Sequence, residues 1–130
     1  MPQLVITSGW MSSFQKLNNF KNMKEVKTKQ ELNEVLSSGN NKKIFIRIHA
    51  NWCQPCKVLG RTILDIEGGY SNDYIFLEVD ADQSDDLVSY LGIYNLPTIV
   101  IFKGQEEVFR KSGLLTRAQL TTILNNFKGE

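Results

Sequence analysis

The segment Trp52-Cys53-Gln54-Pro55-Cys56 decides how the fold of this chain is interpreted, because it holds both cysteines of the 130-residue sequence. A secreted scaffold that depends on disulfides carries more cysteines, spread along its length. Closing so short a loop would stabilise a fold little through chain entropy. We therefore predict that the pair is reactive rather than structural.

A zinc site and a pair of inert core residues are two weaker but open alternatives for the cysteines. A zinc site needs three or four protein ligands, and the chain offers a single histidine, His49, beside Cys53 and Cys56. Two inert core cysteines are also conceivable, although Trp52 and Pro55 beside them are not typical of a core. No metal is expected.

The bulk composition limits the class of protein. A length of 130 residues fits one compact domain that buries most of its apolar surface. The net charge is only +1, so neither nucleic acid nor a membrane surface is an expected partner. No run of residues has the length of a membrane span, and the N-terminus lacks a secretory signal pattern. We therefore expect a cytoplasmic location.

Residues 1–22 show no sustained hydrophobic period, whereas residue 23 begins a segment that continues as a complete domain. We predict that 1–22 is an N-terminal extension, disordered or lying before the native start, and that the domain occupies residues 23–130. A short ordered helix around residues 14–20 is an equally open alternative. Deleting residues 1–22 tests the extension, because loss of an ordered helix would lower the melting temperature strongly.

Capping and hydrophobic patterns locate the secondary structure. Thr28 and Thr116 each open a capping box, which predicts one helix that ends at Gly39 and a final helix that begins at Thr116. Further helices are predicted from Cys53 to Gly68-Gly69 and from Ser84, a candidate cap, to Leu91, and strands at 43–49, 74–79, 98–102 and 107–111. The predicted order is β-α-β-α-β-α-β-β-α, with no residues assigned to the first strand. This order implies parallel crossovers followed by a hairpin.

Cys53 is predicted to lie where a strand is followed by a helix. The first turn of a helix has free N–H groups and the positive end of the helix dipole, and both favour a thiolate. Cysteines in such places have pKa values of roughly 3.5–7.5, compared with about 8.5 for a free cysteine. Pro55 suits this first turn, and a spacing of three places Cys56 on the same helix face. We predict that Cys53 is the nucleophile and Cys56 the resolving cysteine.

The stretch from Ala50 to Lys57 resembles the active-site motif of the thioredoxin family, with Gln54 in place of the usual glycine. Three further features match the family in order, namely Val79-Asp80, Leu96-Pro97-Thr98, and Phe102-Lys103-Gly104 followed by Gly113. The match covers residues 24–127. It implies an α/β thioredoxin-like fold, with a central mixed sheet of four to five strands flanked by helices.

The resemblance also implies a substrate groove and partners. The peptide bond before Pro97 is expected to be cis, so that Pro97 lies beside Cys53 and the Leu96 backbone pairs with an extended substrate. The implied groove residues are Trp52, Gln54, Pro55, Leu96, Pro97 and Gly113. The implied partners are disulfide-containing protein substrates and a reductase that donates electrons. No bound cofactor is expected other than the redox-active disulfide itself.

Both members of a buried charged pair also depart from the family pattern. Arg47 stands where the family has a buried aspartate, and Phe76 stands at the position of a nearby buried lysine. Arg47 is expected either to stabilise a thiolate or to extend to solvent and pair with an acid such as Glu78. His49, on the same strand face as Arg47, is expected either to shuttle a proton of Cys56 or to be purely structural.

The residues and the resemblance together predict a thiol–disulfide oxidoreductase that reduces protein disulfides. An exported disulfide oxidase or isomerase with the same fold is one alternative, which a more oxidising reduction potential would favour. A non-catalytic thioredoxin-like protein-binding module is another, which partner binding without turnover would favour. Gln54 lies between the cysteines and therefore influences the potential, but its sign does not follow from the sequence.

Overall fold

The computed structural model describes residues 23–129, so the predicted extension at 1–22 lies outside the described residues. Five strands form one central sheet in the order β1-β3-β2-β4-β5. Their bounds are β1 Lys24–Glu25, β2 Lys43–His49, β3 Tyr74–Asp80, β4 Thr98–Lys103 and β5 Glu106–Ser112. β1 and β2 pair with β3 in parallel, whereas β4 pairs antiparallel with both β2 and β5. The predicted mixed sheet is confirmed.

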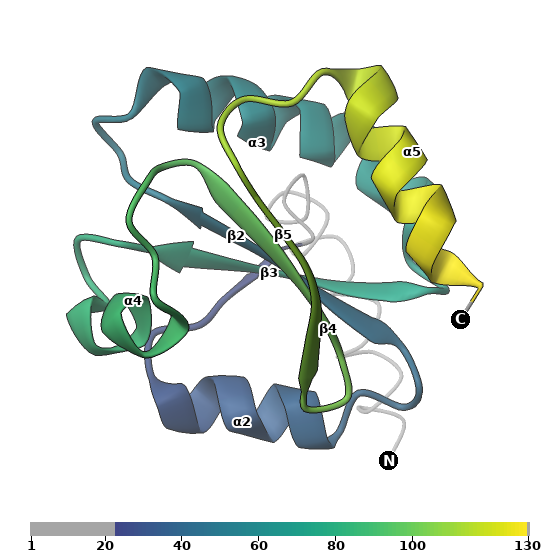
Figure 1. Cartoon of the computed structure of the whole chain (residues 1–130), viewed down its shortest axis with the longest axis horizontal. Coiled ribbons are helices and arrows are strands. Elements are labelled where there is room, and N and C mark those ends of the chain that lie inside the picture. Colours follow the sequence, from purple (N-terminus) through teal and green to yellow (C-terminus); the bar gives the residue numbers. More distant parts are fainter. Residues whose placement is uncertain (1–22, 130) are drawn as a thin grey trace, which may run out of the picture.

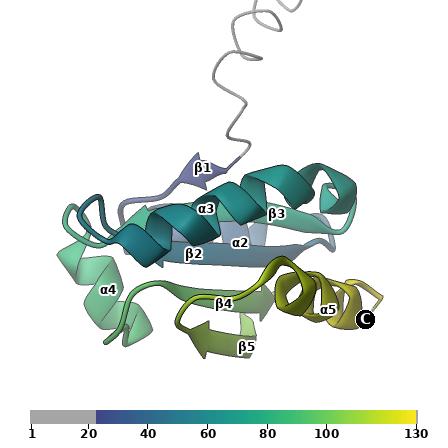
Figure 2. The same cartoon turned by 90° about the horizontal axis from the view of Figure 1, so that it is seen from above.

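Helices cover both faces of this sheet. The helices are α2 Lys29–Ser37, α3 Gln54–Ile66, α4 Asp85–Leu91 and α5 Arg117–Lys128, with a 3₁₀ helix η1 at Glu67–Tyr70. Figure 1 shows α2 and α4 on one face of the sheet and α3 and α5 on the other. Seen from above, β1 and β5 form the two edges and α3 lies over the central strands (Figure 2). Within residues 23–129, no helix is long and apolar enough to span a membrane.

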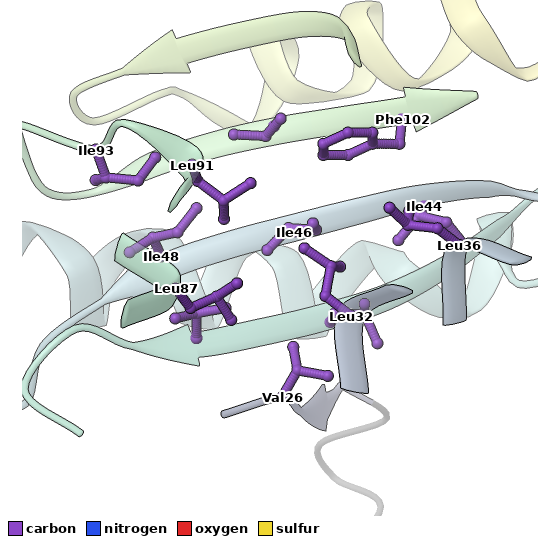
Figure 3. Close-up of a cluster of buried hydrophobic side chains, with 13 residues drawn as sticks. Val26, Leu32, Leu36, Ile44, Ile46, Ile48, Leu87, Leu91, Ile93 and Phe102 are labelled. Carbon is purple, nitrogen blue, oxygen red and sulfur yellow. The ribbon is translucent and has the colours of Figure 1, made fainter. Parts of the chain in front are cut away.

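Side-chain alternation along the strands divides the core into two clusters. In β2, even-numbered residues face α2 and α4, and odd-numbered residues face α3 and α5. Figure 3 shows the first cluster, which includes Val26, Leu32, Leu36, Ile44, Ile46, Ile48, Leu87, Leu91, Ile93 and Phe102. The second cluster includes Phe45 of β2, Tyr74 and Phe76 of β3, and Leu59 of α3. The site described below lies on this second face.

Beyond Phe45, the α3 face of β2 becomes polar. The next two residues on that face are Arg47 and His49, and their partners in β3 are Glu78 and Asp80. All of these lie toward the carboxyl ends of the parallel strands, where the chain passes from β2 into α3. The apolar core under α3 therefore gives way to a charged cluster near the first turns of that helix.

The predicted capping boxes are both present. Thr28 Oγ1 accepts a hydrogen bond from the Glu31 amide at 3.1 Å, and Thr116 Oγ1 accepts one from the Gln119 amide at 3.1 Å. The strand bounds agree with the prediction to within one residue. β1 has only two residues, which is too short for a period to reveal it.

Two details of the predicted helices are wrong. The α-helix after Cys53 ends at Ile66, and Gly68 and Gly69 lie inside η1 instead of terminating the helix. Glycine favours the α-helix poorly, and helix ends often tighten into 3₁₀ turns. Ser84 does occupy the N-cap position of α4, but its side chain makes no capping hydrogen bond. Its backbone, with φ −141° and ψ 53°, lies outside the extended geometry of an N-cap.

Candidate functional site

The two cysteines lie at the start of α3, a few residues after β2 ends. Cys53 is the N-cap of α3, and it forms a disulfide with Cys56 across Cα atoms that are 5.3 Å apart. The Cys56 amide donates a hydrogen bond to Cys53 Sγ at 3.3 Å. The same amide and the positive end of the α3 dipole would stabilise a thiolate on Cys53 after reduction. Pro55 lies in the first turn of α3.

Burial distinguishes the two cysteines. Cys56 is 0% exposed and Cys53 is 5% exposed, while the neighbouring Trp52 is 71% exposed. The spacing of three does bring both sulfurs to one face of α3 and places Cys56 deeper. Cys53 is therefore the cysteine of the pair that lies nearer the surface.

A second loop approaches the cysteines from β4. The Leu96–Pro97 peptide bond is cis, and Leu96 packs against a small cluster formed by Ala50, Cys53 and Cys56. The Gly113 amide donates a hydrogen bond to the Pro97 carbonyl at 2.8 Å. Gly113 has φ +99°, a conformation that favours glycine.

The groove residues named from the sequence thus fall into two groups. In the loop group, Leu96 packs against the cysteines, and Gly113 is hydrogen-bonded to Pro97, the residue that follows Leu96. Trp52, Gln54 and Pro55 belong to the segment that carries the cysteines, and all three are exposed.

Arg47 is buried beneath α3, with 9% of its side chain exposed. Its Nη2 donates to Glu78 Oε1 at 2.7 Å, and its Nη1 donates to the Cys56 carbonyl at 3.2 Å. The expectation of a solvent-extended arginine is therefore wrong, although the suggested acid, Glu78, is its partner. The cause is the close approach of α3, which covers the guanidinium.

Gly60 makes this close approach possible. A Cβ atom at Gly60 would lie 3.2 Å from both Cζ and Nη1 of Arg47, which is tighter than ordinary van der Waals contact. The absence of a side chain at this position lets α3 pass over the guanidinium plane.

His49 adjoins the same ion pair. Its Nε2 lies 3.7 Å from Glu78 Oε1, and 16% of its side chain is exposed. His49, Arg47, Glu78, Cys56 and Gly60 all line one open cavity of about 290 Å³. Arg47 and His49, the two candidate tuning residues of β2, therefore both line the cavity that reaches the resolving cysteine.

The sequence named Glu78 as a candidate partner of Arg47, but it did not reveal the role of Gly60 in this cluster. Alternation provided a usable signal for Glu78, because Phe76, Glu78 and Asp80 share one face of β3. Phe76 itself belongs to the aromatic core, with its ring centroid 5.0 Å from that of Phe45. On the same face of β3, Glu78 is the carboxylate that lies opposite Arg47 in the strand register.

Within residues 23–129, no group of three or more His, Cys, Asp or Glu side chains is placed to hold a metal ion. The sulfurs of Cys53 and Cys56 are bonded to each other. The pair is thus a redox disulfide at a helix N-terminus, next to a cis-proline loop on a mixed sheet. This combination defines a thiol–disulfide oxidoreductase.

Comparison with known proteins agrees with that class. The thioredoxin family model matches residues 23–126. The thioredoxin of Mycoplasmoides gallisepticum is 32% identical over 102 residues, which cover 78% of this chain and 99% of the relative. The thioredoxin of Sus scrofa is 33% identical over 91 residues, covering 70% of this chain and 86% of the relative.

Solved structures show the same fold. The Fasciola hepatica thioredoxin superimposes with a TM-score of 0.76 at 24% identity, over 82% of this chain and all of the other. The mitochondrial thioredoxin 3 of Saccharomyces cerevisiae gives a TM-score of 0.73 at 21% identity, over 83% of this chain and 98% of the other. The chain belongs to the thioredoxin family, and the prediction of a thioredoxin-like disulfide reductase is confirmed.

Proposed function

We propose that this thioredoxin-family protein reduces disulfides in folded or extended protein substrates, with Cys53 as the nucleophile and Cys56 as the resolving cysteine. The observation that carries these roles is the Cys56 amide directed at Cys53 Sγ, combined with the complete burial of Cys56. The amide stabilises negative charge on the sulfur that a substrate reaches first.

The reaction proceeds in two exchanges. The Cys53 thiolate attacks one sulfur of the substrate disulfide, the substrate S–S bond breaks, and the other substrate sulfur leaves as a thiolate. Cys56 then loses its proton and attacks Cys53 Sγ, which releases the second substrate thiolate. The Cys53–Cys56 disulfide that results is the state seen in the structure. A reductase partner returns two electrons to it, and no further cofactor takes part.

The substrate groove combines the two groups of residues described above. Trp52, Gln54 and Pro55 supply the exposed surface at the start of α3, and Leu96, Pro97 and Gly113 supply the opposing loop. We expect an extended substrate to pair with the backbone at Leu96, as an added strand would. A cytoplasmic setting suits this reaction, because the cytoplasm keeps thiols reduced.

An insulin-type reduction assay tests the proposal together with the reduction potential of the cysteine pair. The parent protein should reduce insulin, and its potential should be near that of dithiol reductants, at roughly −270 mV. Cys53→Ser should abolish turnover, whereas Cys56→Ser should accumulate a mixed disulfide on Cys53 that mass spectrometry detects.

The alternatives predict different results. A potential close to about −120 mV would favour a disulfide oxidase. Absence of turnover in the parent, with partner binding retained after both cysteines are changed to serine, would favour a binding module. A mixed disulfide on Cys56 in Cys53→Ser would contradict the assigned roles.

A further inference from the structure

The cavity beside Cys56 has a lining that differs from the substrate groove. It is lined by Met23, Arg47, His49, Ala50, Asn51, Cys56, Lys57, Gly60, Arg61, Leu64 and Glu78. None of the six groove residues is among them. We propose that this cavity is the exit for the Cys56 proton, with His49 as the acceptor and Glu78 as its positioning residue. The inference rests on the proposed function, because only a resolving cysteine must lose a proton there.

The second exchange requires a path by which the buried Cys56 thiol can lose its proton. Cys56 is fully buried, and in the mixed disulfide the substrate is attached to Cys53 and covers the groove. The thiol of Cys56 must nevertheless be deprotonated before its sulfur can attack. The cavity lining includes Cys56 but none of the groove residues, so we expect it to stay open while the substrate is bound.

Glu78 is held at a defined place in this cavity. Its carboxylate is 8% exposed and accepts from Arg47 at 2.7 Å. Arg47 in turn donates to the Cys56 carbonyl at 3.2 Å. This chain of two hydrogen bonds fixes the carboxylate relative to the resolving cysteine.

His49 is the group that can accept the Cys56 proton and pass it to solvent. Its Nε2 lies 3.7 Å from Glu78 Oε1, within reach of electrostatic attraction, and part of the ring is exposed to solvent. Imidazole changes charge close to neutral pH, whereas the Glu78 carboxylate is already paired with a guanidinium. The carboxylate therefore orients the ring and stabilises the imidazolium.

The other charged groups near His49 are either hydrogen-bonded or paired elsewhere, or exposed to solvent. Asp80, its neighbour across the β2–β3 ladder, accepts from the Asp82 amide at 3.0 Å. Lys57 and Arg61 of α3 line the cavity, and both are exposed residues. Arg47 completes the set, and its charge is compensated by Glu78.

The proposed step balances without any added reactant. The Cys56 proton passes to neutral His49, and the thiolate attacks Cys53 Sγ of the mixed disulfide. The Cys53–substrate bond breaks, the Cys53–Cys56 bond forms, and the substrate sulfur leaves as a thiolate. The imidazolium then gives its proton to solvent through the open side of the cavity.

Stopped-flow kinetics with dithiobis(nitrobenzoate), an aryl disulfide that releases a coloured thiolate, separates the two exchanges. The reduced full-length protein releases one aryl thiolate when Cys53 attacks and a second when Cys56 resolves. We expect Glu78→Gln to leave the first release within about twofold of the parent and to slow the second roughly tenfold. The pH of half-maximal second release should move lower, because the imidazolium loses its carboxylate partner.

His49→Gln supplies the second arm and decides the result even if Glu78→Gln fails to fold. It should slow the second release and remove the inflection near neutral pH from the pH profile of that release. The double variant Glu78→Gln/His49→Gln should be no slower than His49→Gln alone. The matched control is Glu107→Gln, which breaks an Arg110 ion pair on β5 and should leave both releases unchanged. Unaltered second release and an unaltered pH profile in His49→Gln would overturn the inference. Failure of the parent to reduce insulin would instead refute the proposed function.

Discussion

At the scale of single residues, the Arg47–Glu78 pair shows how a buried charge is accommodated near the reactive sulfurs. Removing two ions from water costs several kcal/mol each, and a close pair offsets that cost only when hydrogen bonds satisfy its polar atoms. Glu78 and the Cys56 carbonyl satisfy both terminal nitrogens of Arg47, whereas its buried Nε has no hydrogen-bond partner within residues 23–129. The carbonyl belongs to the resolving cysteine itself, so the pair links β2, β3 and α3 at the site.

Gly60→Ala tests this link at its tightest point. The new Cβ would press on a guanidinium that is held at both ends, so we expect the bond to the Cys56 carbonyl to weaken. Alanine favours a helix over glycine by about 1 kcal/mol, which offsets part of the strain. The second aryl-thiolate release should slow severalfold, while the free energy of unfolding changes by less than about 1 kcal/mol.

Gly68→Ala is the matched control, because a Cβ there would meet no atom within 4 Å. Urea unfolding and stopped-flow release, measured on both variants, give the comparison. Equal second-release rates in the parent and Gly60→Ala would show that the close approach of α3 to Arg47 does not matter for resolution.

At the scale of elements, the sequence predicted what local chemistry determines. Capping boxes at Thr28 and Thr116 and the apolar run of β2 depend on neighbours within a few residues, and their elements were located closely. The burial of Arg47 depends instead on α3 lying directly over β2, which requires Gly60 far along the chain. Such a contact between two elements has no local signature, so the sequence left open whether Arg47 stabilises a thiolate or extends to solvent.

Arg110 of β5 forms hydrogen bonds with the end of α4. Its Nη1 and Nη2 donate to the carbonyls of Gly92 and Leu91 at 3.0 and 2.6 Å, where the helix leaves carbonyls unpaired. It also forms a two-bond ion pair with Glu107 at 2.8 Å. The hydrogen bond from Arg110 holds the pKa of the Glu107 carboxyl below its ordinary value of 4.5.

This lowered pKa predicts a pH-dependent stability difference. A carboxyl with a depressed folded pKa contributes stability above its unfolded pKa and loses it as the pH falls through the folded value. Glu107→Gln should therefore be less stable than the parent at neutral pH, by less than about 1 kcal/mol because the pair is partly exposed. The difference should disappear in acid. Urea unfolding across the acid range measures it, and a deficit that stays constant with pH would contradict the assignment to this pair.

At the scale of the whole molecule, the two faces of the sheet have different tasks. The face covered by α2 and α4 carries the apolar cluster of Figure 3. The face covered by α3 and α5 is apolar beneath Phe45 and then carries Arg47, Glu78 and His49 under the disulfide helix. The chemistry therefore sits on one face, while both faces supply the free energy of folding.

Leucine truncation on each face separates these contributions. Leu32 of α2 and Leu59 of α3 are both fully buried, so each change to alanine should cost roughly 2–5 kcal/mol of unfolding free energy. Leu32→Ala should leave the per-molecule rate of insulin reduction close to the parent's at a temperature where it is folded. Leu59→Ala should lower that rate as well, because it loosens α3 over the Arg47 pair. Urea unfolding and insulin turnover measure the two effects, and equal losses of turnover in both variants would show that the site is coupled to the whole core rather than to one face.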